Sequence, residues 1–343
     1  MSEKKFNVVL VGCGGMANGW MESAVKNPSL NIVGLVDIRR EAAEKMAEKY
    51  HLDGSVVFGN VDEALEKTKA DLVFDVTVPG VHHDVVISAL KHGCHVLGEK
   101  PLSDNMASAR EMVATAQKAG KVYAVMQNRR FDPNIRAVRQ TLDSGALGNV
   151  AEVHADFFIG AHFGGFRDVM EDVLIVDMAI HTFDQARFIS AGDPVSVYCH
   201  SSNPAHSWYK HHASAICIFE MSGGVTFTYR GSWCAEGLQT TWESNWRIVT
   251  SKGTLLWDGA TGIKAQRVKE GGKHGFCSEM EDVPVSIAPL AFTGHDGLIR
   301  DYVECLQTGR TPMTIAADNI KSLAMVMAAV ESRKTGQKIA ISI

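Results

Sequence analysis

The sequence predicts an α/β plus α+β protein, with a doubly wound parallel sheet in its N-terminal part and an open, predominantly antiparallel sheet in its C-terminal part. From residue 6 to about residue 127, short continuously apolar runs alternate with helical patterns, which is typical of repeated βα units. After residue 130 the runs are longer and alternate in polarity, which is typical of strands with one solvated face. A chain of 343 residues has the length of two ordinary domains, and we predict them at 1–127 and 128–343.

The N-terminal part is expected to alternate strands and helices in strict order. Strands are predicted at 6–11, 31–36, 56–58, 72–76, 95–98 and 122–127, and helices at 15–26, 39–49, 61–67, 83–92 and 103–119. In a parallel sheet of this kind, ligands bind beyond the carboxyl ends of the strands. The side chains that directly follow each strand are therefore the first candidates for function.

The C-terminal part is expected to open with a helix at 133–144 that ends at Gly145, a usual helix stop. Strands of alternating polarity are predicted at 149–159, 195–201, 213–220, 224–232, 246–250, 254–258 and 262–267, helices at 171–190, 296–308 and 317–335, and a loop at 284–292. Turn signals such as Ser222-Gly223-Gly224 separate several of these strands and favour an antiparallel arrangement.

The composition excludes several classes of protein. The net charge of −5 offers no basic surface for nucleic acid or anionic lipid, and no apolar run approaches the length of a membrane span. Residues 1–5 lack the apolar core of a signal peptide. The seven cysteines are scattered without a C-x-x-C pair, which indicates reduced thiols and a cytoplasmic protein.

The stretch that follows the first strand predicts a dinucleotide site. Gly12, Gly14 and Ala17 fit the G-x-G-x-x-G/A fingerprint, in which the small residues allow a tight turn, close approach of a pyrophosphate, and packing of the helix on the strand. The N–H groups of the helix that begins near Gly15 would face the phosphates. Asp37 ends the second strand, where a carboxylate can accept hydrogen bonds from the adenosine ribose. A structural turn without a ligand remains the alternative.

Asp37 favours NAD over NADP, because a carboxylate at this place repels a 2′-phosphate. Arg39 and Arg40 follow at once and leave NADP possible, although both also fit solvated residues in the first turn of the next helix.

Two further stretches carry groups suited to hydride chemistry. In Glu99-Lys100-Pro101, a strand ends at the ligand edge of the sheet, and an ammonium group there can stabilise a developing alkoxide. An exposed loop lysine is the alternative. On a helix, Asp177, His181 and Asp184 would share one face, and a histidine beside a carboxylate is a tunable acid/base. A satisfied core histidine is the alternative there. No C-x-x-C or H-E-x-x-H spacing supports a metal, and we predict none.

Together these stretches resemble the glucose–fructose oxidoreductase and inositol dehydrogenase family (Gfo/Idh/MocA) over essentially the whole chain. The resemblance rests on Gly12–Ala17, Asp37, Thr77-x-Pro79-x-x-His82, Glu99-Lys100-Pro101, Asn128-Arg129-Arg130-Phe131, Gly145-x-x-Gly148 and Asp177-x-x-x-His181. It implies a Rossmann domain followed by a sheet domain whose outer face packs against a neighbouring subunit, in a homodimer or homotetramer. It also implies catalytic roles: Lys100 binds the reacting hydroxyl, His181 moves its proton, and Asp177 orients them.

The predicted site residues fall into two groups. The cofactor-binding residues are Gly12, Gly14, Gly15, Met16, Ala17, Asp37, Ile38, Thr77, Pro79, His82, Glu99, Lys100 and Asn128. The substrate-binding residues are Lys100, Asn128, Arg129, Arg167, Asp177 and His181. His82 is expected to line the cofactor groove and His83 to face solvent. The aromatic rings of Trp233, Trp242 and Trp246 could stack on a sugar or fill a core or interface.

The sequence departs from the family pattern beside the predicted acid/base. Ala179 stands where the family commonly has glycine, and Met170-Glu171-Asp172 replaces a glycine cluster. These departures bear on which substrate is bound.

Three functions fit the sequence. The first is an NAD-dependent dehydrogenase of a sugar, polyol or inositol-like cyclic alcohol. The second is a redox-type glycosidase, which oxidises a ring hydroxyl transiently, eliminates the glycosidic group and returns the hydride, using the same residues. The third, a dinucleotide sensor without catalysis, leaves the joint presence of Lys100 and His181 unexplained.

Overall fold

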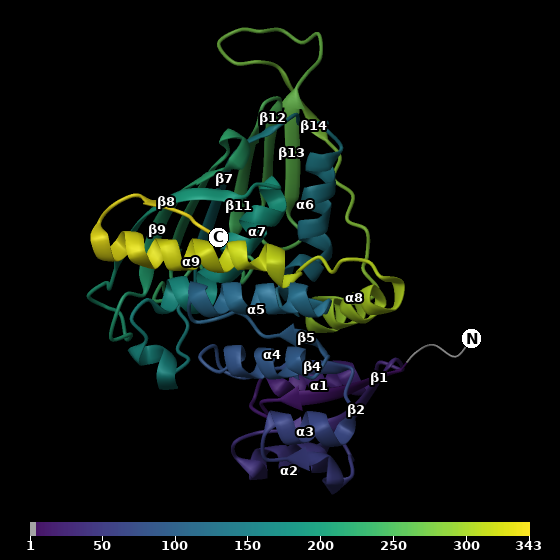
Figure 1. Cartoon of the computed structure of the whole chain (residues 1–343). Coiled ribbons are helices and arrows are strands. Elements are labelled where there is room, and N and C mark those ends of the chain that lie inside the picture. The colour runs from purple at the N-terminus through teal and green to yellow at the C-terminus, as the bar shows by residue number, and fades with distance from the viewer. Residues whose placement is uncertain (1–4) are drawn as a thin grey trace. The chain divides into compact units, whose positions relative to one another are not determined.

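A computed structural model describes residues 5–343, so the expectation about the N-terminal signal rests in part on residues 1–4, which lie outside the described residues (Figure 1). The backbone divides into two compact units. The N-terminal unit runs to Phe131 and includes Ala291–Leu323, and the C-terminal unit comprises Asp132–Leu290 and Ala324–Ile343. The border predicted after residue 127 lies four residues before this division, and the sequence pattern did not predict the return of residues 291–323 to the N-terminal unit.

The N-terminal unit is built on a six-stranded parallel sheet in the order β3-β2-β1-β4-β5-β6. Its strands are β1 (Phe6–Val11), β2 (Leu30–Val36), β3 (Val57–Phe58), β4 (Leu72–Asp75), β5 (His95–Gly98) and β6 (Tyr123–Val125). Its helices are α1 (Ala17–Val25), α2 (Arg40–Lys49), α3 (Val61–Thr68), α4 (His82–Lys91), α5 (Met106–Ala119) and α8 (Gly294–Thr308). The strand order reverses between β1 and β4, and this switch point is where doubly wound sheets bind dinucleotides. The predicted Rossmann architecture is thereby confirmed.

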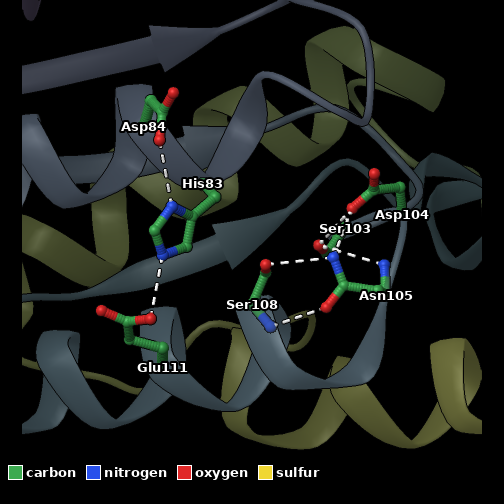
Figure 2. Close-up of polar contacts among 7 residues, drawn as sticks. All are labelled: His83, Asp84, Ser103, Asp104, Asn105, Ser108 and Glu111. Atoms are coloured by element: carbon green, nitrogen blue, oxygen red, sulfur yellow. Dashed lines mark hydrogen bonds and ion pairs between the residues drawn. The ribbon is translucent and has the colours of Figure 1, made fainter.

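Polar side chains fix where the helices begin. The side-chain oxygen of Asn60 accepts a hydrogen bond from the N–H of Glu63 at the start of α3, and Asn105 does the same for Ser108 at the start of α5 (Figure 2). These caps satisfy N–H groups that have no partner inside the helix. They also explain why α5 begins three residues later than the helix predicted at 103–119.

Residues 291–323, which belong to the N-terminal unit although they come late in the chain, contact the parallel sheet through α8. Helix α8 places the hydroxyl of the fully buried Tyr302 2.9 Å from the carbonyl oxygens of both Val96 and Val122. Leu298, Ile299 and Val303 of the same helix belong to the core cluster of the N-terminal unit. The core of this unit is therefore completed by a residue that lies 206 and 180 positions after the two residues it contacts.

The C-terminal unit contains a nine-stranded sheet in the order β14-β13-β12-β11-β7-β10-β9-β8-β15. Its strands are β7 (Val150–Phe158), β8 (Pro194–Ser202), β9 (Ser214–Met221), β10 (Thr226–Ser232), β11 (Asn245–Thr250), β12 (Gly253–Trp257), β13 (Ile263–Val268), β14 (Met280–Val283) and β15 (Ile339–Ala340). All neighbours pair antiparallel except β7 and β10, which are parallel. The predominantly antiparallel sheet is confirmed, whereas its two short edge strands, β14 and β15, were not predicted.

One face of this sheet is buried and the other is exposed. Residues of α6 (Pro133–Asp143), α7 (Ile180–Ser190) and the C-terminal half of α9 (Ala316–Thr335) share a core cluster with the buried face. In β9 the exposure alternates residue by residue, so that Cys217 and Phe219 are buried while Ile216 and Ile218 are about half exposed, at 51% and 48%. This alternation follows from the two-residue period of a strand.

Within residues 5–343, no helix combines the length and the apolar character needed to cross a bilayer.

Candidate active site

The turn after β1 leaves no room for a side chain at its first glycine. Gly12 has a φ of +93°, and a Cβ atom placed on it would lie 2.6 Å from the carbonyl oxygen of Val76. Its N–H donates a hydrogen bond to the carbonyl of Val36 at 2.8 Å. Gly12 is thus held between the ends of β2 and β4, and both its conformation and its surroundings require glycine.

The next residues of the turn offer open backbone. A Cβ atom on Gly14 or Gly15 would meet no atom within 4 Å. Among the described residues, no acceptor receives the N–H groups of Gly14, Gly15 or Met16, whereas Ala17 is fully buried at the start of α1. Unpaired N–H groups at a helix N-terminus favour an anion. The residues present therefore fit a pyrophosphate.

Asp37 is tied directly to this turn. One carboxylate oxygen accepts a hydrogen bond from the N–H of Cys13 and the other from the N–H of Arg39, both at 2.8 Å. The Asp37 side chain is 9% exposed, whereas its neighbour Ile38 is almost entirely exposed. Burial and the charge of Asp37 raise the pKa of the Cys13 thiol to about 12, so this thiol stays neutral. The predicted proximity of Asp37 and the glycine turn is found in the structure.

The end of β4 holds His82 differently from the expectation. Its ring is 1% exposed, and Nδ1 lies 2.8 Å from the carboxylate of Asp75 and 3.2 Å from the hydroxyl of Thr77. Thr77 and Pro79 are half-buried in the turn between β4 and α4. His82 is therefore buried beneath this turn instead of lining a groove. His83 is also held, since its ring lies 3.1 Å from both Asp84 and Glu111.

Glu99 lies inside the N-terminal unit, directly after β5. Its carboxylate accepts hydrogen bonds from the indole N–H of Trp20 at 2.8 Å and from the N–H of Lys100 at 3.0 Å. Burial alone would raise the pKa of Glu99, but the bonds from His295 and Trp20, with the charges of His295 and Lys100, outweigh it and hold the pKa below its usual value. Glu99 is thus a buried anion bonded to the backbone of Lys100, and its predicted role in binding the cofactor stays a prediction.

His295 is a residue that the sequence analysis missed. It lies in the first turn of α8, with Nε2 3.8 Å from the Glu99 carboxylate and Nδ1 3.3 Å from the side-chain amide of Asn128. It therefore links two predicted site residues from a segment 167 positions away. No local pattern around His295 signals this contact. Asn128 and the half-buried Arg129 begin a 3-10 turn, residues Asn128–Phe131.

In the C-terminal unit, two predicted site residues form an ion pair. The Arg167 Nε donates a hydrogen bond to a carboxylate oxygen of Asp177 at 2.6 Å. The guanidinium carbon lies 4.7 Å from the ring centre of Phe166 and 5.0 Å from that of Phe163, within the range of a cation–π contact. Phe163 and Phe166 are largely exposed, so this cluster presents aromatic rings and a charged pair at the surface of the unit.

Asp177 and His181 lie where one kind of helix changes into another. Asp177 belongs to a π-helical turn, Leu174–Ala179, and the half-buried His181 lies in the first turn of α7. Such π-turns occur frequently at functional sites. The sequence pattern predicted one regular helix at 171–190 with Asp184 on the same face. Asp184 is instead buried, 3.8 Å from the guanidinium of Arg187.

The tryptophan region is mostly core. Trp233 and Trp246 are buried, and Trp246 stacks on Trp257 with ring centres 6.2 Å apart. Trp242 is 46% exposed and lies 6.2 Å from the ring of Phe163. Trp242 is thus the exposed member of the predicted cluster.

The predicted residues belong to different units. Lys100, Asn128 and Arg129 lie in the N-terminal unit, and Arg167, Asp177 and His181 in the C-terminal unit. The convergence of Lys100 and His181 on one substrate stays a prediction. In the part of the chain that the structure describes, no group of three or more His, Cys, Asp or Glu side chains is arranged to hold a metal ion.

Residues 6–127 match the model of the oxidoreductase family with an NAD-binding Rossmann fold, GFO_IDH_MocA, and residues 135–256 match the GFO/IDH/MocA C-terminal domain. The chain is 23% identical to a 1,5-anhydro-D-fructose reductase from Ensifer adhaerens, covering 96% of each chain. It is 23% identical to a D-apiose dehydrogenase from Paraburkholderia graminis, covering 98% of this chain and 90% of the relative.

Solved structures share the fold. An oxidoreductase from Agrobacterium radiobacter, crystallised with NAD⁺, L-tartaric acid and magnesium, superposes with a TM-score of 0.85 at 22% identity, and the match covers 98% of both chains. A likeness at this level of identity establishes the architecture of the chain.

Proposed function

The chain belongs to the GFO/IDH/MocA oxidoreductase family, and from that premise we propose that it is an NAD-dependent dehydrogenase of a sugar, polyol or inositol-like substrate. The observation that carries the proposal is the glycine turn, where Gly14 and Gly15 are open and Asp37 is bonded to Cys13. The names of relatives that act on sugars support the substrate class. The nicotinamide ring of bound NAD⁺ supplies the hydride acceptor.

We assign the protein's own chemistry to three side chains. The Lys100 ammonium donates a hydrogen bond to the reacting hydroxyl and stabilises the negative charge that grows on its oxygen. The His181 imidazole takes the hydroxyl proton during oxidation and returns it in the reverse direction. Asp177, held by Arg167 at 2.6 Å, orients the substrate or the imidazole. The carboxylate of the buried Glu99 accepts a hydrogen bond from the N–H of Lys100 at 3.0 Å and so fixes the backbone that carries the ammonium.

Substrate recognition is assigned to polar groups of both units. Asn128 and Arg129 provide donors from the N-terminal unit, and Arg167 from the C-terminal unit. Arg167 uses Nε for Asp177, and no hydrogen bond from its two terminal nitrogens falls on another described residue. Those nitrogens are therefore available to a substrate hydroxyl or carboxylate.

A substrate screen tests the proposed function. The protein is incubated with NAD⁺ and a panel of free sugars, inositols, sugar acids and aryl glycosides, while NADH absorbance and aglycone release are followed together. Steady NADH production from a free sugar or polyol is expected. Aglycone release without net NADH would identify the redox glycosidase instead, and neither signal in the presence of bound NAD⁺ would favour a sensor.

Replacing Asp37 with alanine should weaken NAD⁺ binding by about tenfold, because the ribose loses a charged acceptor. NADP⁺ binding should change much less or improve, since the negative charge beside its 2′-phosphate is gone. A cavity of about 320 Å³ lined by Arg39, Lys45 and Lys49 adjoins Cys13 and could receive that phosphate. The dissociation constants of both cofactors are measured by titration.

Arg40→Ala is the matched control for Asp37→Ala, because Arg40 pairs with Glu44 at 2.8 Å and does not line this cavity. The ratio of the two dissociation constants should be the same in Arg40→Ala as in the wild type. An unchanged ratio in Asp37→Ala would remove the role assigned to Asp37.

We also propose that the exposed sheet face packs against a second copy of the chain, in a homodimer or homotetramer. Ile216, Ile218 and Tyr198 expose apolar surface there of a kind that monomeric proteins rarely leave uncovered. Ile218→Glu should reduce the mass in solution by at least one subunit, because a buried unpaired carboxylate opposes association. Light scattering measures this mass. Phe276→Ser, in the fully exposed turn between β13 and β14, should keep the wild-type mass. A monomeric wild type would contradict the proposal.

A further inference from the structure

A single buried carboxylate ties together both ends of the turn between β4 and α4. Asp75, the last residue of β4, is fully buried. Its Oδ1 accepts hydrogen bonds from the Thr77 N–H at 3.1 Å and the Thr77 hydroxyl at 2.6 Å. Its Oδ2 lies 2.8 Å from Nδ1 of His82, the first residue of α4. The segment from Thr77 to His82 is therefore anchored at each end by the same group.

The turn between β4 and α4 lies against the glycine turn that follows β1. The carbonyl oxygen of Val76 is the atom that a side chain on Gly12 would strike, at 2.6 Å. The N–H of Val76 donates to the carbonyl of Val11 at 2.8 Å, so the chain here lies directly against the end of β1. Any movement of residues 76–81 changes the shape of the space beside Gly12. Asp75 and His82 thus anchor the segment that lies against Gly12.

The charges around His82 favour its protonated form. Burial alone would lower the pKa of His82, but the charge and hydrogen bond of Asp75, with the charges of Glu99 and Asp104, outweigh it and raise the pKa. These carboxylates belong to the last residue of β4, to the residue after β5 and to the segment before α5. An imidazolium here neutralises Asp75, which would otherwise be a buried anion with neutral partners only.

The other ring nitrogen has an unusual position. Nε2 of His82 is buried and has no hydrogen-bond partner among the described residues. Polar atoms in such a position are rare because they forfeit their hydration. The ring is therefore held from one side only, through Nδ1 and Asp75.

We propose that His82 is a positioning residue for the cofactor: with Asp75 it holds the turn between β4 and α4 in the shape that binds the dinucleotide, and loss of its proton loosens the turn and weakens NAD⁺ binding. The inference rests on the proposed function, because it assumes that the glycine turn binds NAD⁺. It gives His82 an indirect role, since its ring is buried.

The direction of the pH effect follows from the raised pKa. A group whose folded pKa lies above its unfolded value stabilises the fold below the unfolded pKa, near 6.5 for histidine. This stabilisation is lost as the pH rises through the folded pKa. Affinity for NAD⁺ is therefore expected to be highest in acid-to-neutral solution and to fall above the folded pKa of His82.

Two substitutions of His82 and one matched control test the proposal. His82→Ala removes the bond to Asp75. His82→Asn keeps a neutral donor near the place of Nδ1. His83→Ala is the control, since His83 is the adjacent histidine but lies on the surface between Asp84 and Glu111 (Figure 2). For each protein, the NAD⁺ dissociation constant is titrated from about pH 6 to about pH 9, across the range of histidine. Thermal unfolding and turnover at saturating NAD⁺ are measured in parallel.

His82→Ala should raise the NAD⁺ dissociation constant by at least about tenfold, the effect of one charge-assisted hydrogen bond. Its turnover at saturating NAD⁺ should stay within about twofold of the wild type, because the catalytic groups are intact. His82→Asn should bind NAD⁺ more weakly than the wild type at neutral pH, as the wild type itself does above the folded pKa of His82, and its affinity should not change with pH. His83→Ala should match the wild type throughout.

Three results would overturn the inference. The first is wild-type affinity in His82→Ala. The second is a pH dependence of binding that persists in His82→Asn. The third is a fall in turnover at saturating NAD⁺ as large as the fall in affinity, in the folded Asn variant. If the wild type itself does not bind NAD⁺, the proposed function fails and the inference with it, whereas binding by the wild type with any of the three results refutes the inference alone.

Discussion

Replacing Lys100 with alanine should lower turnover by about 1,000-fold, while the NAD⁺ dissociation constant changes by less than about threefold. Removal of one preorganised donor from a developing oxyanion typically costs two to three orders of magnitude in rate. The ammonium acts on the substrate oxygen, so cofactor binding through Gly14 and Asp37 should persist. Turnover is measured on the substrate that the screen identifies, and NAD⁺ binding by titration.

Two companion substitutions make this result specific. Lys118→Ala removes an exposed lysine in the last turn of α5 and should leave turnover unchanged. Lys100→Arg keeps the positive charge over the buried Glu99 but moves the donors, so its turnover should fall between that of the alanine variant and that of the wild type. Near-wild-type turnover in Lys100→Ala would refute the catalytic assignment and leave the sensor function standing.

The parallel sheet and its cofactor edge could be predicted because their signals are local. An apolar run followed by a helical pattern indicates each βα unit, and the fingerprint at Gly12 lies within one turn of the chain. The hydrogen bond between Asp37 and Cys13 follows from the same logic, because the carboxyl ends of neighbouring parallel strands meet at one edge.

Contacts between distant segments could not be predicted in this way. His295 reaches Glu99 and Asn128 only because α8 returns to the N-terminal unit, and nothing in its own sequence window indicates that return. The parallel pairing of β7 with β10 is likewise a contact between segments far apart in the chain, and the sequence pattern does not indicate it. The alternation of polar and apolar side chains along a strand is visible in a sequence pattern, whereas the direction in which the neighbouring strand runs is not.

Whether a polar side chain is buried or exposed also could not be predicted from the sequence pattern. From motif and spacing, His82 was expected to line the cofactor groove and Asp184 to share a helix face with the predicted acid/base. In the structure they are buried, because each finds an oppositely charged partner that offsets the loss of water, Asp75 for His82 and Arg187 for Asp184. Burial of a charged group depends on its partner, and a single residue pattern does not contain the partner.

Gly12→Ala and Gly14→Ala should fail in different ways, although both place one methyl group in the same turn. At Gly12 the methyl would lie 2.6 Å from the Val76 carbonyl in a backbone with a φ of +93°, so we expect a loss of about 3 kcal/mol in the free energy of unfolding without any cofactor. At Gly14 the methyl would meet no protein atom, and stability without cofactor should match the wild type.

The difference appears when NAD⁺ is added. Gly14→Ala should lose at least about tenfold in NAD⁺ affinity, because the methyl occupies the space through which the pyrophosphate approaches the backbone. Thermal unfolding with and without NAD⁺ separates the two effects, since a ligand raises the midpoint only of a protein that binds it. Gly12→Ala should unfold early in both conditions, whereas Gly14→Ala should unfold normally without NAD⁺ and gain little from it. A full NAD⁺-induced rise in Gly14→Ala would show that no pyrophosphate lies against this backbone, and the dinucleotide site would have to be sought elsewhere in the chain.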